Sequence, residues 1–429
     1  MRVLVIGSGG REHVLAYKLA VSPHVSDVCC APGNAGTASV GANVPVMPDD
    51  HDGLVKLARD RNMALTIVGP EAPLCAGIVD RFESEGLRIF GPTAAAARLE
   101  GDKAFAKRLL KSANVPTASA RIFDRFHEAK AYVASRDDGV VVKASGLAAG
   151  KGVSVCPDPA DALLVLERMM VQRVFGDAGQ TVVVEELLKG EELSVFALVD
   201  DRTIYVLETA QDHKAIGDGD TGPNTGGMGA FSPAPIATPE IMAKVERDIL
   251  VPIVDAMRQE GCPYRGLLYV GLMLTAAGPK VLEFNCRFGD PETQPLLMRL
   301  ESDLFELLDA TAAGRLDQIE VQWSPRAAVC VVMASQGYPD AYETGKEITG
   351  LDRAAKMDDV IVFHAGTKRR GDRVLSSGGR VLGVTALGDS IEAARKRAYE
   401  AVNVIHFENA YYRKDIGVRA TRGAPAVKV

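Results

Sequence analysis

Short apolar runs alternate with helical stretches over the first hundred residues, and this alternation constrains the fold more than any other feature. Strands that alternate with helices form a parallel sheet, because each helix carries the chain back to the start of the next strand. The turns at 7–11, 32–36 and 69–73 are rich in small and polar residues. In an open parallel sheet such turns meet at one edge, where ligands bind. The expected strands are 3–6, 25–30, 65–68 and 88–90, and the expected helices are 12–21, 53–62 and 77–86.

The rest of the chain divides into a smaller unit, a glycine-rich loop and further α/β structure. The unit at about 122–190 has the size of a lid. The loop at 211–233 is too polar for a core segment and too patterned for a simple linker. Residues from about 325 form a separate α/β module. The lid is expected to contain helices 126–135 and 160–174 and strands 140–143, 153–155 and 181–185; a helix at 239–259, strands at 267–275 and 280–287 and a helix at 391–404 follow.

The stretch 283–288 sorts its side chains onto two faces, because the side chains of a strand alternate with a period of two. Its even-numbered residues are apolar, so we interpret Cys286 as a core residue and not as a nucleophile. The opposite face carries Glu283, Asn285 and Arg287. Hard oxygen ligands hold Mg²⁺, and an arginine neutralises charge on a transferred phosphoryl group. A solvated edge strand is the alternative, but the polar run 289–294 that follows favours a functional site.

The glycine turn at 7–11 resembles a dinucleotide-binding fingerprint up to its last position, where Glu12 replaces the glycine needed for close helix packing. The second expected strand ends in Ala-Pro-Gly and not in an acid for a ribose hydroxyl, so NAD binding is disfavoured. With NAD binding disfavoured, the turn still predicts the N-terminus of a helix beside Arg11. The free backbone N–H groups of that helix end can hold a phosphate. A plain strand-to-helix turn explains this segment equally well.

Two further segments point to a nucleotide. The segment 141–153 has the wrong spacing for a Walker loop, with Gly152 where a Ser or Thr should meet the metal. A strand ending in Lys143, then a glycine turn with Lys151, instead predicts a flap over nucleotide phosphates; a solvated turn is the alternative. The segment 182–192 could form a hinge for adenine, with Glu191 or Glu192 on the ribose, although charge pairs at strand ends are usually only solvated.

Composition restricts the class of protein. The chain has 429 residues, a formal charge of −7 and a pI near 5.6, so it lacks the basic surplus typical of nucleic-acid binding, and its length predicts several domains. Its seven cysteines contain no Cys-x-x-Cys pair, which argues against a zinc site or a disulfide framework. We expect a cytoplasmic protein that does not bind membranes, because no signal peptide or spanning segment is evident. Among the histidines, only His213 is retained as a functional candidate.

Taken together, Lys103, the Lys143 flap, the 185–188 hinge and the pair Glu283 and Asn285 resemble the ATP-grasp superfamily. The order of the motifs resembles one of its families, the phosphoribosylamine–glycine ligases (glycinamide ribonucleotide synthetases) of purine biosynthesis. The resemblance covers nearly the whole chain and is most specific in the glycine loop and at 282–294. Its motifs are VLVIGSGGREH (3–13), GPEAPL (69–74), KASGLAAGKGV (143–153), DGDTGPNTGGMGA (218–230), EFNCRFGDPETQ (283–294), FHAGT (363–367), SSGGR (376–380) and YRKDIG (412–417).

The resemblance implies a multidomain fold of the α/β and α+β classes. A Rossmann-like parallel-sheet domain for substrate would precede the ATP-grasp fold, and a small C-terminal α/β domain would follow it. The implied boundaries are 1–101 for the N-terminal domain, 102–121 and 191–324 for the central ATP-grasp domain, 122–190 for its lid, and 325–429 for the C-terminal domain.

The resemblance also implies a reaction in two steps. ATP phosphorylates the glycine carboxylate, and the amine of 5-phosphoribosylamine then attacks the acyl phosphate, giving glycinamide ribonucleotide, ADP and phosphate. Mg²⁺ or Mn²⁺ is the implied cofactor, these small molecules are the partners, and a transient contact with the enzyme that makes phosphoribosylamine would fit this role. The implied ATP ligands are Lys103, Lys143, Glu185, Glu186, Leu188 and Glu192; the metal ligands are Glu283 and Asn285; the catalytic residues are Arg287 and Asp212; and the substrate-binding residues are Gly9, Gly10, Arg11, Asn34, Glu71, Asp212, Thr221, Pro223, Asn224, Thr225 and Arg287.

One departure concerns the metal. Many ATP-grasp enzymes place a metal carboxylate on the strand before the Glu-x-Asn pair, whereas the segment that begins at Tyr269 offers none. A second Mg²⁺ would therefore need Asp212 or be held mostly by ATP.

Two alternatives remain open. The first is a sibling ATP-grasp enzyme such as a biotin-dependent carboxylase subunit; the segment Ala355-Lys-Met lacks the preceding methionine of a biotinyl-lysine motif, although a carrier can be a separate chain. The second is a non-catalytic nucleotide-binding module. Such a module would not need phosphate-binding and metal-binding groups arranged for catalysis, and the presence of Lys103, Lys143, Glu283 and Asn285 together speaks against it.

Overall fold

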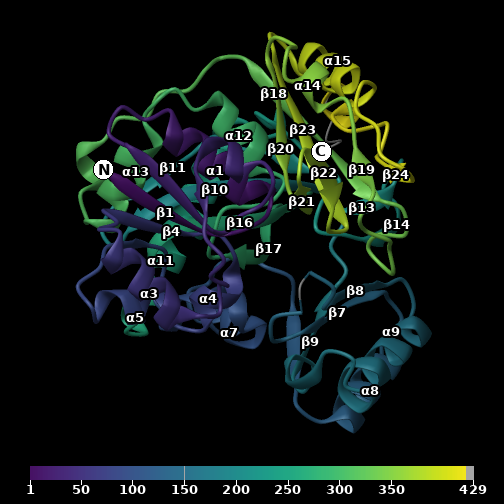
Figure 1. The fold of residues 1–429 in the computed structure, drawn as a ribbon. Coiled ribbons are helices and arrows are strands. Elements are labelled where there is room, and N and C mark those ends of the chain that lie inside the picture. The colour runs from purple at the N-terminus through teal and green to yellow at the C-terminus, as the bar shows by residue number, and fades with distance from the viewer. Residues whose placement is uncertain (149, 422–429) are drawn as a thin grey trace.

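The computed structural model describes residues 1–148 and 150–421 (Figure 1). In this part of the chain, one parallel sheet lies at the N-terminus, and antiparallel sheets form the centre, the lid and the C-terminal region. Figure 1 shows the N-terminal and central elements on one side, the C-terminal sheet above, and the lid projecting below. The same described residues contain no helix long and apolar enough to cross a membrane.

The N-terminal region confirms the predicted parallel sheet, with strand order β3-β2-β1-β4-β5. Helix α1 begins two residues earlier than predicted, because the Glu12 carboxylate accepts the N–H of the N-cap residue Gly9. Elements of two to five residues, namely β3, α2 and α4, were not predicted. The elements are β1 (Arg2–Gly7), α1 (Gly10–Ala20), β2 (Asp27–Pro32), α2 (Thr37–Val40), β3 (Ala42–Asn43), α3 (His51–Asp60), β4 (Leu65–Val68), α4 (Glu71–Cys75), α5 (Ile78–Glu83), β5 (Ile89–Phe90) and α6 (Ala94–Gly101).

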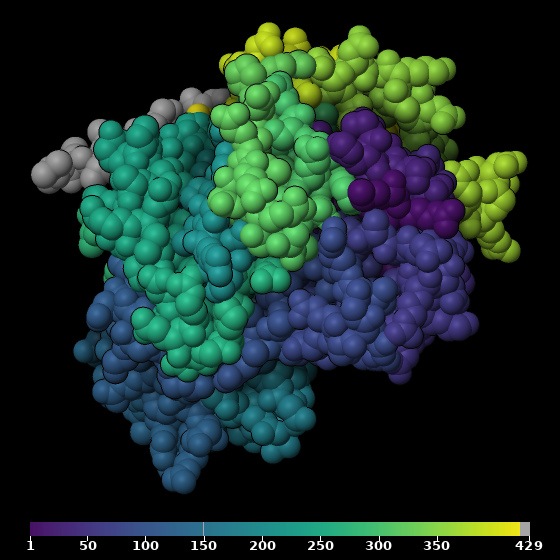
Figure 2. Space-filling view, turned by 90° about the vertical axis from the view of Figure 1, so that its left-hand side faces the viewer, coloured from purple at the N-terminus to yellow at the C-terminus, as the bar shows by residue number. Residues whose placement is uncertain are grey.

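The lid is a small antiparallel sheet in the order β6-β9-β7-β8, with two helices that bury one face in a separate core. Strand β6 escaped prediction because most of its side chains are exposed. The second helix ends earlier than expected and continues as a π-helical turn, Glu167–Val171. In the space-filling view the lid protrudes at the lower end of the molecule (Figure 2). Its elements are β6 (Ala120–Phe123), α8 (Phe126–Ala134), β7 (Val140–Ala144), β8 (Val153–Cys156), α9 (Pro159–Leu166) and β9 (Val182–Glu186).

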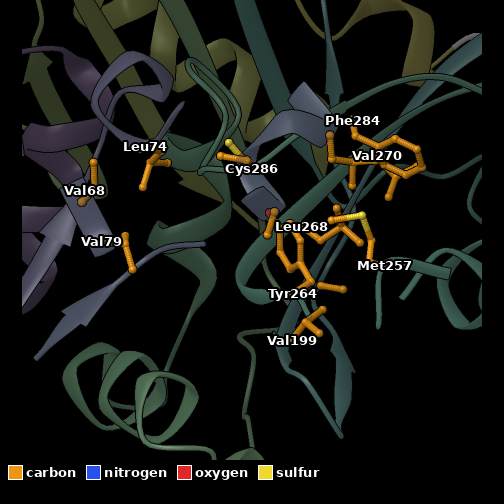
Figure 3. Close-up of a cluster of buried hydrophobic side chains, with 14 of the residues drawn as sticks. Val68, Leu74, Val79, Val199, Met257, Tyr264, Leu268, Val270, Phe284 and Cys286 are labelled. Carbon is orange, nitrogen blue, oxygen red and sulfur yellow. The ribbon is translucent and has the colours of Figure 1, made fainter. Parts of the chain in front are cut away.

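The central sheet has the order β11-β10-β16-β17 and shares a hydrophobic core with the N-terminal region. Figure 3 shows this core: Leu268 and Val270 of β16 lie with Met257 of α11, and the same cluster reaches Leu74 and Val79 of the N-terminal region. The elements are α7 (Lys103–Ser112), β10 (Glu191–Asp200), β11 (Ile204–Val206), α10 (Pro239–Val245), α11 (Val251–Gln259), β16 (Arg265–Thr275), β17 (Gly278–Asn285), α12 (Thr293–Arg299) and α13 (Leu304–Ala312).

The glycine loop contains four short strands, which sequence reasoning did not predict. Strands β12 and β15 join the C-terminal sheet in the order β12-β15-β18-β23-β20, and β13 pairs with β14 as a hairpin. Gln211, Asp212 and His213 are buried, so the expectation that the loop is too polar for a core is wrong at this end. The strands of the loop are β12 (Gln211–Asp212), β13 (Ala215–Gly217), β14 (Thr221–Asn224) and β15 (Gly229–Ser232).

The C-terminal sheet packs helix α15 against one face. Because it includes β12 and β15, it crosses the boundary expected at 324/325, and that boundary stays a prediction. The remaining elements are β18 (Ala327–Ser335), β19 (Glu347–Ile348), α14 (Leu351–Ala354), β20 (Val360–His364), β21 (Thr367–Arg370), β22 (Arg373–Ser376), β23 (Arg380–Gly388), α15 (Ile391–Val402), β24 (Ala410–Tyr411) and α16 (Val418–Thr421).

The shared core predicts the cost of a cavity. Leu268 is 1% exposed, so Leu268→Ala should lower the free energy of unfolding by about 2–5 kcal/mol through lost burial and an unfilled cavity. Val251 on α11 is 48% exposed, and Val251→Ala should change it by no more than about 0.5 kcal/mol. Urea unfolding followed by circular dichroism compares the two variants, and equal losses of stability would contradict this description of the core.

Candidate active site

A cavity of about 290 Å³ lies where the central sheet, helix α7, the lid and the glycine loop meet. Its walls come from segments far apart in the sequence, and many of the side chains that line it are charged. The central sheet contributes Tyr269, Met273, Glu283 and Asn285, helix α7 contributes Lys103 and Lys107, the lid contributes Val141, Lys143, Val153 and Glu185, and the glycine loop contributes Asp212, Lys214 and Thr225.

Most of the predicted site residues line this cavity, although their roles stay predictions. The flap residue Lys151 is exposed and does not line it, and residue 149 of the same motif lies outside the described residues. The predicted residues in the lining are Glu71, Lys103, Lys143, Glu185, Glu186, Leu188, Glu192, Asp212, Asn224, Thr225, Glu283, Asn285 and Arg287. The predicted residues outside it are Gly9, Gly10, Arg11, Asn34, Thr221 and Pro223.

Two lysines hold the carboxylate of Glu185 at the junction of lid and central domain. Lys107 Nζ lies 3.1 Å from Glu185 Oε1, and Lys143 Nζ lies 3.0 Å from Oε2. Lys143 also donates to the carbonyl of Leu282 in β17 at 2.9 Å. Burial lowers the pKa of Lys107, and Glu185 opposes this effect. The carboxylate of Glu185 is therefore engaged within the protein, and sequence reasoning missed Lys107, although it lies one helical turn after Lys103 on α7.

Strand β17 ends at Asn285, yet the expected alternation continues beyond it. Phe284, Cys286 and Phe288 are at most 3% exposed, whereas Glu283, Asn285 and Arg287 line the cavity. The even-numbered face is thus core, as expected.

Arg287 sits among polar partners. It donates to Asn285 Oδ1 at 3.0 Å, and its guanidinium lies 3.3 Å from Glu71 Oε2 and 3.0 Å from Glu100 Oε1. Burial alone would raise the pKa of Glu71, but Arg287 and Arg11 bring it below its ordinary value. Glu100 was not predicted; its carboxylate accepts the N–H of Cys286, 186 residues away, and no local pattern in the sequence marks that contact.

The donor set at Glu283 and Asn285 fits a hard divalent cation. Burial acts to raise the pKa of Glu283, but Lys214, Lys143, Lys103 and Arg287 together lower it, so the carboxylate is ionised. Carboxylate and amide oxygens are the ligands that Mg²⁺ takes in proteins. Within the described chain, no three His, Cys, Asp or Glu side chains gather as a metal site. A metal here would need phosphate or water oxygens as further ligands.

A group of acids around Lys214 also lines the cavity. Lys214 Nζ pairs with Glu192 at 2.8 Å and reaches Glu283 at 3.8 Å. Burial raises the pKa of Asp212 to about 7; Lys214 opposes this, and Glu292 and Glu192 add to it. Sequence reasoning gave Glu292 no role, although it lies in the polar run 289–294.

His213 does not line the cavity. It is 1% exposed, and its Nε2 accepts the N–H of Gly417 at 3.4 Å. Burial lowers its pKa to about 3, so the ring is neutral at pH 7. We therefore interpret His213 as a packing residue that joins the glycine loop to the C-terminal segment.

The N-terminal turns converge, but protein groups occupy part of the expected phosphate seat. Gly9 N–H donates to Glu12 Oε2, and Arg11 N–H donates to Asp290 Oδ2 at 3.3 Å. Asn34 joins two regions, because its Nδ2 donates to the carbonyls of Ser8 and of His364 in the FHAGT motif, both at 2.8 Å. The proposed substrate contacts of Gly9, Gly10, Arg11 and Asn34 stay predictions.

The two other C-terminal motifs hold the glycine loop. Arg380 of the SSGGR motif donates to the carbonyls of Gly226 and Asp290, both at 2.6 Å. Arg413 of the YRKDIG motif is fully buried and binds Asp415 at 2.6 Å and Asp220 of the hairpin at 2.9 Å. The hairpin β13–β14 exposes Thr221 and Pro223, while Asn224 and Thr225 at its base line the cavity.

This network predicts that charge at Asp220 keeps the hairpin ordered. Asp220→Asn preserves shape and tolerates the positive φ of 59°, but it weakens the contacts to Arg413 and Arg419. Hydrogen–deuterium exchange should become faster across residues 215–224. Asp359→Asn is the matched control, since Asp359 has φ 63° and pairs at 2.7 Å with Arg326, which is not part of the hairpin. Unchanged exchange in the hairpin of the Asp220 variant would contradict the role of this contact.

The lid, the central sheet and the lysines and acids between them define an ATP-grasp enzyme. Sequence profiles of phosphoribosylglycinamide synthetase match its N domain at residues 1–100, its ATP-grasp (A) domain at 101–293 and its C domain at 328–419. The chain belongs to this family and is an ATP-dependent ligase of purine biosynthesis.

Two relatives and one more distant structure illustrate the likeness. The chain is 54% identical to phosphoribosylamine–glycine ligase of Rhodopirellula baltica over 425 residues, 97% of each chain. The crystal structure of phosphoribosylamine–glycine ligase from Thermotoga maritima is similar with a TM-score of 0.83 and 33% identity, covering 97% of this chain and 100% of that one. A biotin carboxylase domain from Hydrogenobacter thermophilus, at 17% identity and a TM-score of 0.71 over 96% of this chain and 91% of its own, shares the fold alone.

Proposed function

We propose that this chain joins glycine to 5-phosphoribosylamine through a glycyl phosphate intermediate. In the first step a glycine carboxylate oxygen takes the γ-phosphoryl group of ATP and ADP leaves. In the second step the amine nitrogen attacks the acyl carbon, the carbon–oxygen bond to phosphate breaks, and the amine loses a proton. The products are glycinamide ribonucleotide, ADP and phosphate. One observation carries the proposal: a single cavity gathers Lys103, Lys143 and Arg287 with Glu283 and Asn285.

The charges in the cavity suit the first step. Phosphoryl transfer depends mainly on positioning and on neutralising charge. We assign Lys103 and Lys143 to the ATP phosphates and Arg287 to the transferring phosphoryl group or the glycine carboxylate. Glu283 and Asn285 would hold Mg²⁺ or Mn²⁺, which when bound neutralises phosphate charge.

The remaining assignments concern the nucleotide and the second substrate. Backbone groups of the lid hinge at Glu186 and Leu188 would bind adenine beside Glu185, and Glu192 would bind the ribose. Asp212 and the 221–225 stretch would close over the acyl phosphate, which requires the exposed hairpin to approach the cavity. The converging turns that carry Gly9, Gly10, Arg11, Asn34 and Glu71 would receive phosphoribosylamine.

The cellular setting follows from the reaction. Phosphoribosylamine is short-lived in water, so a transient contact with the enzyme that makes it would shorten its exposure. We place this chemistry in the cytoplasm.

The proposed reaction predicts that ADP release depends on all three substrates. Purified enzyme with ATP, Mg²⁺, glycine and freshly generated phosphoribosylamine should release ADP and form a product with the mass of glycinamide ribonucleotide. Omission of glycine should abolish both signals. ADP release that ignores glycine would argue against this ligase reaction.

Arg287 should act mainly in the transition state. Arg287→Ala should lower kcat by about 10²–10³-fold and leave ATP binding nearly unchanged, because the guanidinium stabilises charge that develops during transfer. Arg287→Lys should recover only part of the rate, since an ammonium lacks the planar fork. Arg326→Ala, a surface arginine paired with Asp359, is the control for loss of a guanidinium. Turnover that survives the Ala substitution would remove Arg287 from the mechanism.

Glu283 should determine metal affinity. Loss of a residue that only supports a metal ligand typically weakens metal binding about 10- to 100-fold. Glu283 is proposed as a direct ligand, so Glu283→Gln should weaken Mn²⁺ binding in the presence of ATP by at least about tenfold. Electron paramagnetic resonance of free Mn²⁺ measures this directly and does not depend on turnover. The exposed Glu260→Gln serves as control. Equal affinities in the two variants would exclude Glu283 as a ligand.

A further inference from the structure

Cys75 differs from the other cysteines of the chain. All seven are free thiols within the described residues, and Cys75, the last residue of helix α4, is the only one that is not buried. A hydrogen bond with Cys286 lowers the pKa of the Cys75 thiol. Burial instead raises the pKa of five others, namely Cys29, Cys30, Cys156, Cys262 and Cys330. Oxidants attack thiols that solvent reaches and that ionise more readily than an ordinary cysteine.

A second thiol lies next to Cys75, although it belongs to a distant part of the sequence. Helix α4 and strand β17 both pack against helix α6. At the end of α6, a Cβ atom on Gly101 would lie 2.8 Å from Cys75 Sγ, and the preceding residue, Glu100, has its Oε2 atom 3.0 Å from Cys286 Sγ. In Figure 3, Cys286 lies in the same hydrophobic cluster as Leu74, the residue before Cys75. The end of α6 thus brings two thiols together, and they are hydrogen-bond partners.

Cys286 is connected to the proposed catalytic residue Arg287 through Glu100. The N–H and the thiol of Cys286 both donate to Glu100 Oε2, at 2.7 Å and 3.0 Å. The other oxygen of the same carboxylate, Oε1, lies 3.0 Å from the guanidinium of Arg287. A change that removes the thiol proton and draws the sulfur of Cys286 towards α4 therefore disturbs the carboxylate that positions Arg287.

We propose that Cys75 is an oxidation site and that its product, a disulfide with Cys286, reversibly inhibits the enzyme. The Cys75 thiolate attacks one oxygen of hydrogen peroxide, the O–O bond breaks, hydroxide leaves, and Cys75 becomes a sulfenic acid. Cys286 then passes its thiol proton to Glu100, its sulfur attacks the sulfur of Cys75, and the S–O bond breaks as a second hydroxide leaves. The two hydroxide ions take up the two thiol protons. Two thiols and one peroxide thus give one disulfide and two water molecules.

The proposed disulfide is a transient bond and not part of a structural framework. Disulfides of cytosolic proteins are usually of this kind and respond to the redox state of the cell. A neighbouring thiol also protects a sulfenic acid, because the disulfide can be reduced whereas further oxidation is mostly irreversible. The inhibitory effect rests on the proposed function, in which Arg287 acts on the transferring phosphoryl group or the glycine carboxylate. A misplacement of about 1 Å in such a site can lower the rate about 100-fold.

The test begins with the native enzyme. Reduced enzyme is treated with a small excess of hydrogen peroxide, its remaining thiols are alkylated, and it is digested with trypsin without reduction. Mass spectrometry should find peptides 62–81 and 281–287, each of which contains one cysteine, joined by a disulfide. Glycine-dependent ADP release should fall at least about tenfold, and dithiothreitol should restore it and separate the two peptides.

Three variants separate the roles of the two thiols. Cys75→Ser should keep nearly the native kcat before oxidation and should retain it in peroxide; Cys75→Ala repeats the comparison without a hydroxyl. Cys286→Ser removes the second thiol, so a sulfenic acid should accumulate at Cys75 and react with dimedone. The control is Cys262→Ser, because Cys262 belongs to the same hydrophobic cluster but lies in the turn between α11 and β16. This control should remain as sensitive to peroxide as the native enzyme.

Each other outcome overturns the inference. A different linkage, or a sulfinic acid at Cys75 without any linkage, would refute the pairing with Cys286. A complete disulfide in fully active enzyme would refute the inhibition. Peroxide that inactivates both Cys75 variants as fast as the native enzyme would assign the sensitivity to another group. By contrast, reduced native enzyme without glycine-dependent ADP release refutes the proposed function itself, while the linkage is still measured by mass, so the two failures are distinguishable.

Discussion

A carboxylate shared by two lysines joins the lid to the rest of the molecule. Glu185 lies on lid strand β9, Lys143 on lid strand β7 and Lys107 on helix α7 of the central domain, and all three are at most 8% exposed. Breaking a buried pair by removing one partner leaves an uncompensated charge, so each of the three residues depends on the others. Lys143 further binds the backbone of β17 next to Glu283. The position of the cavity between lid and sheet follows from this junction.

Residues of the C-terminal region bind the segments that carry predicted site residues. This region contributes none of the predicted site residues, yet His364, Arg380 and Arg413 bind the segments that do, namely the N-terminal turns, the polar run after β17 and the glycine hairpin. These contacts explain why three motifs far from the ATP-grasp core belong to the family resemblance. A glycine-rich hairpin has little side-chain packing of its own, so its conformation must be imposed by partners.

The sequence predicted those features that depend on local periodicity. The alternation along 283–288 placed Glu283 and Asn285 correctly, and it placed Arg287 on the same face even though β17 ends before it. Features created by long-range pairing were not predictable. Strand β15 forms because β18, about a hundred residues later, supplies its partner, and β12 in turn pairs with β15. The local pattern of α6 gives no sign that Glu100 faces Arg287, whereas Lys107 follows Lys103 by one helical turn on α7 and could have been linked to it. Glu292 stood in a segment already recognised as polar, but only the assembled cavity shows that its carboxylate forms no ion pair with any described residue.

The division of the hydrophobic cores determines which parts of the molecule can shift as units. The N-terminal region and the central sheet share one continuous cluster, so their relative positions are fixed by packing, and the turns that carry Gly9 and Glu71 cannot separate from β17 without exposing it. The lid keeps its own small cluster, centred on Val142 and Val184, and joins the body mainly through polar contacts. A displacement of the lid as a unit would therefore break ion pairs and hydrogen bonds but would leave its hydrophobic core buried.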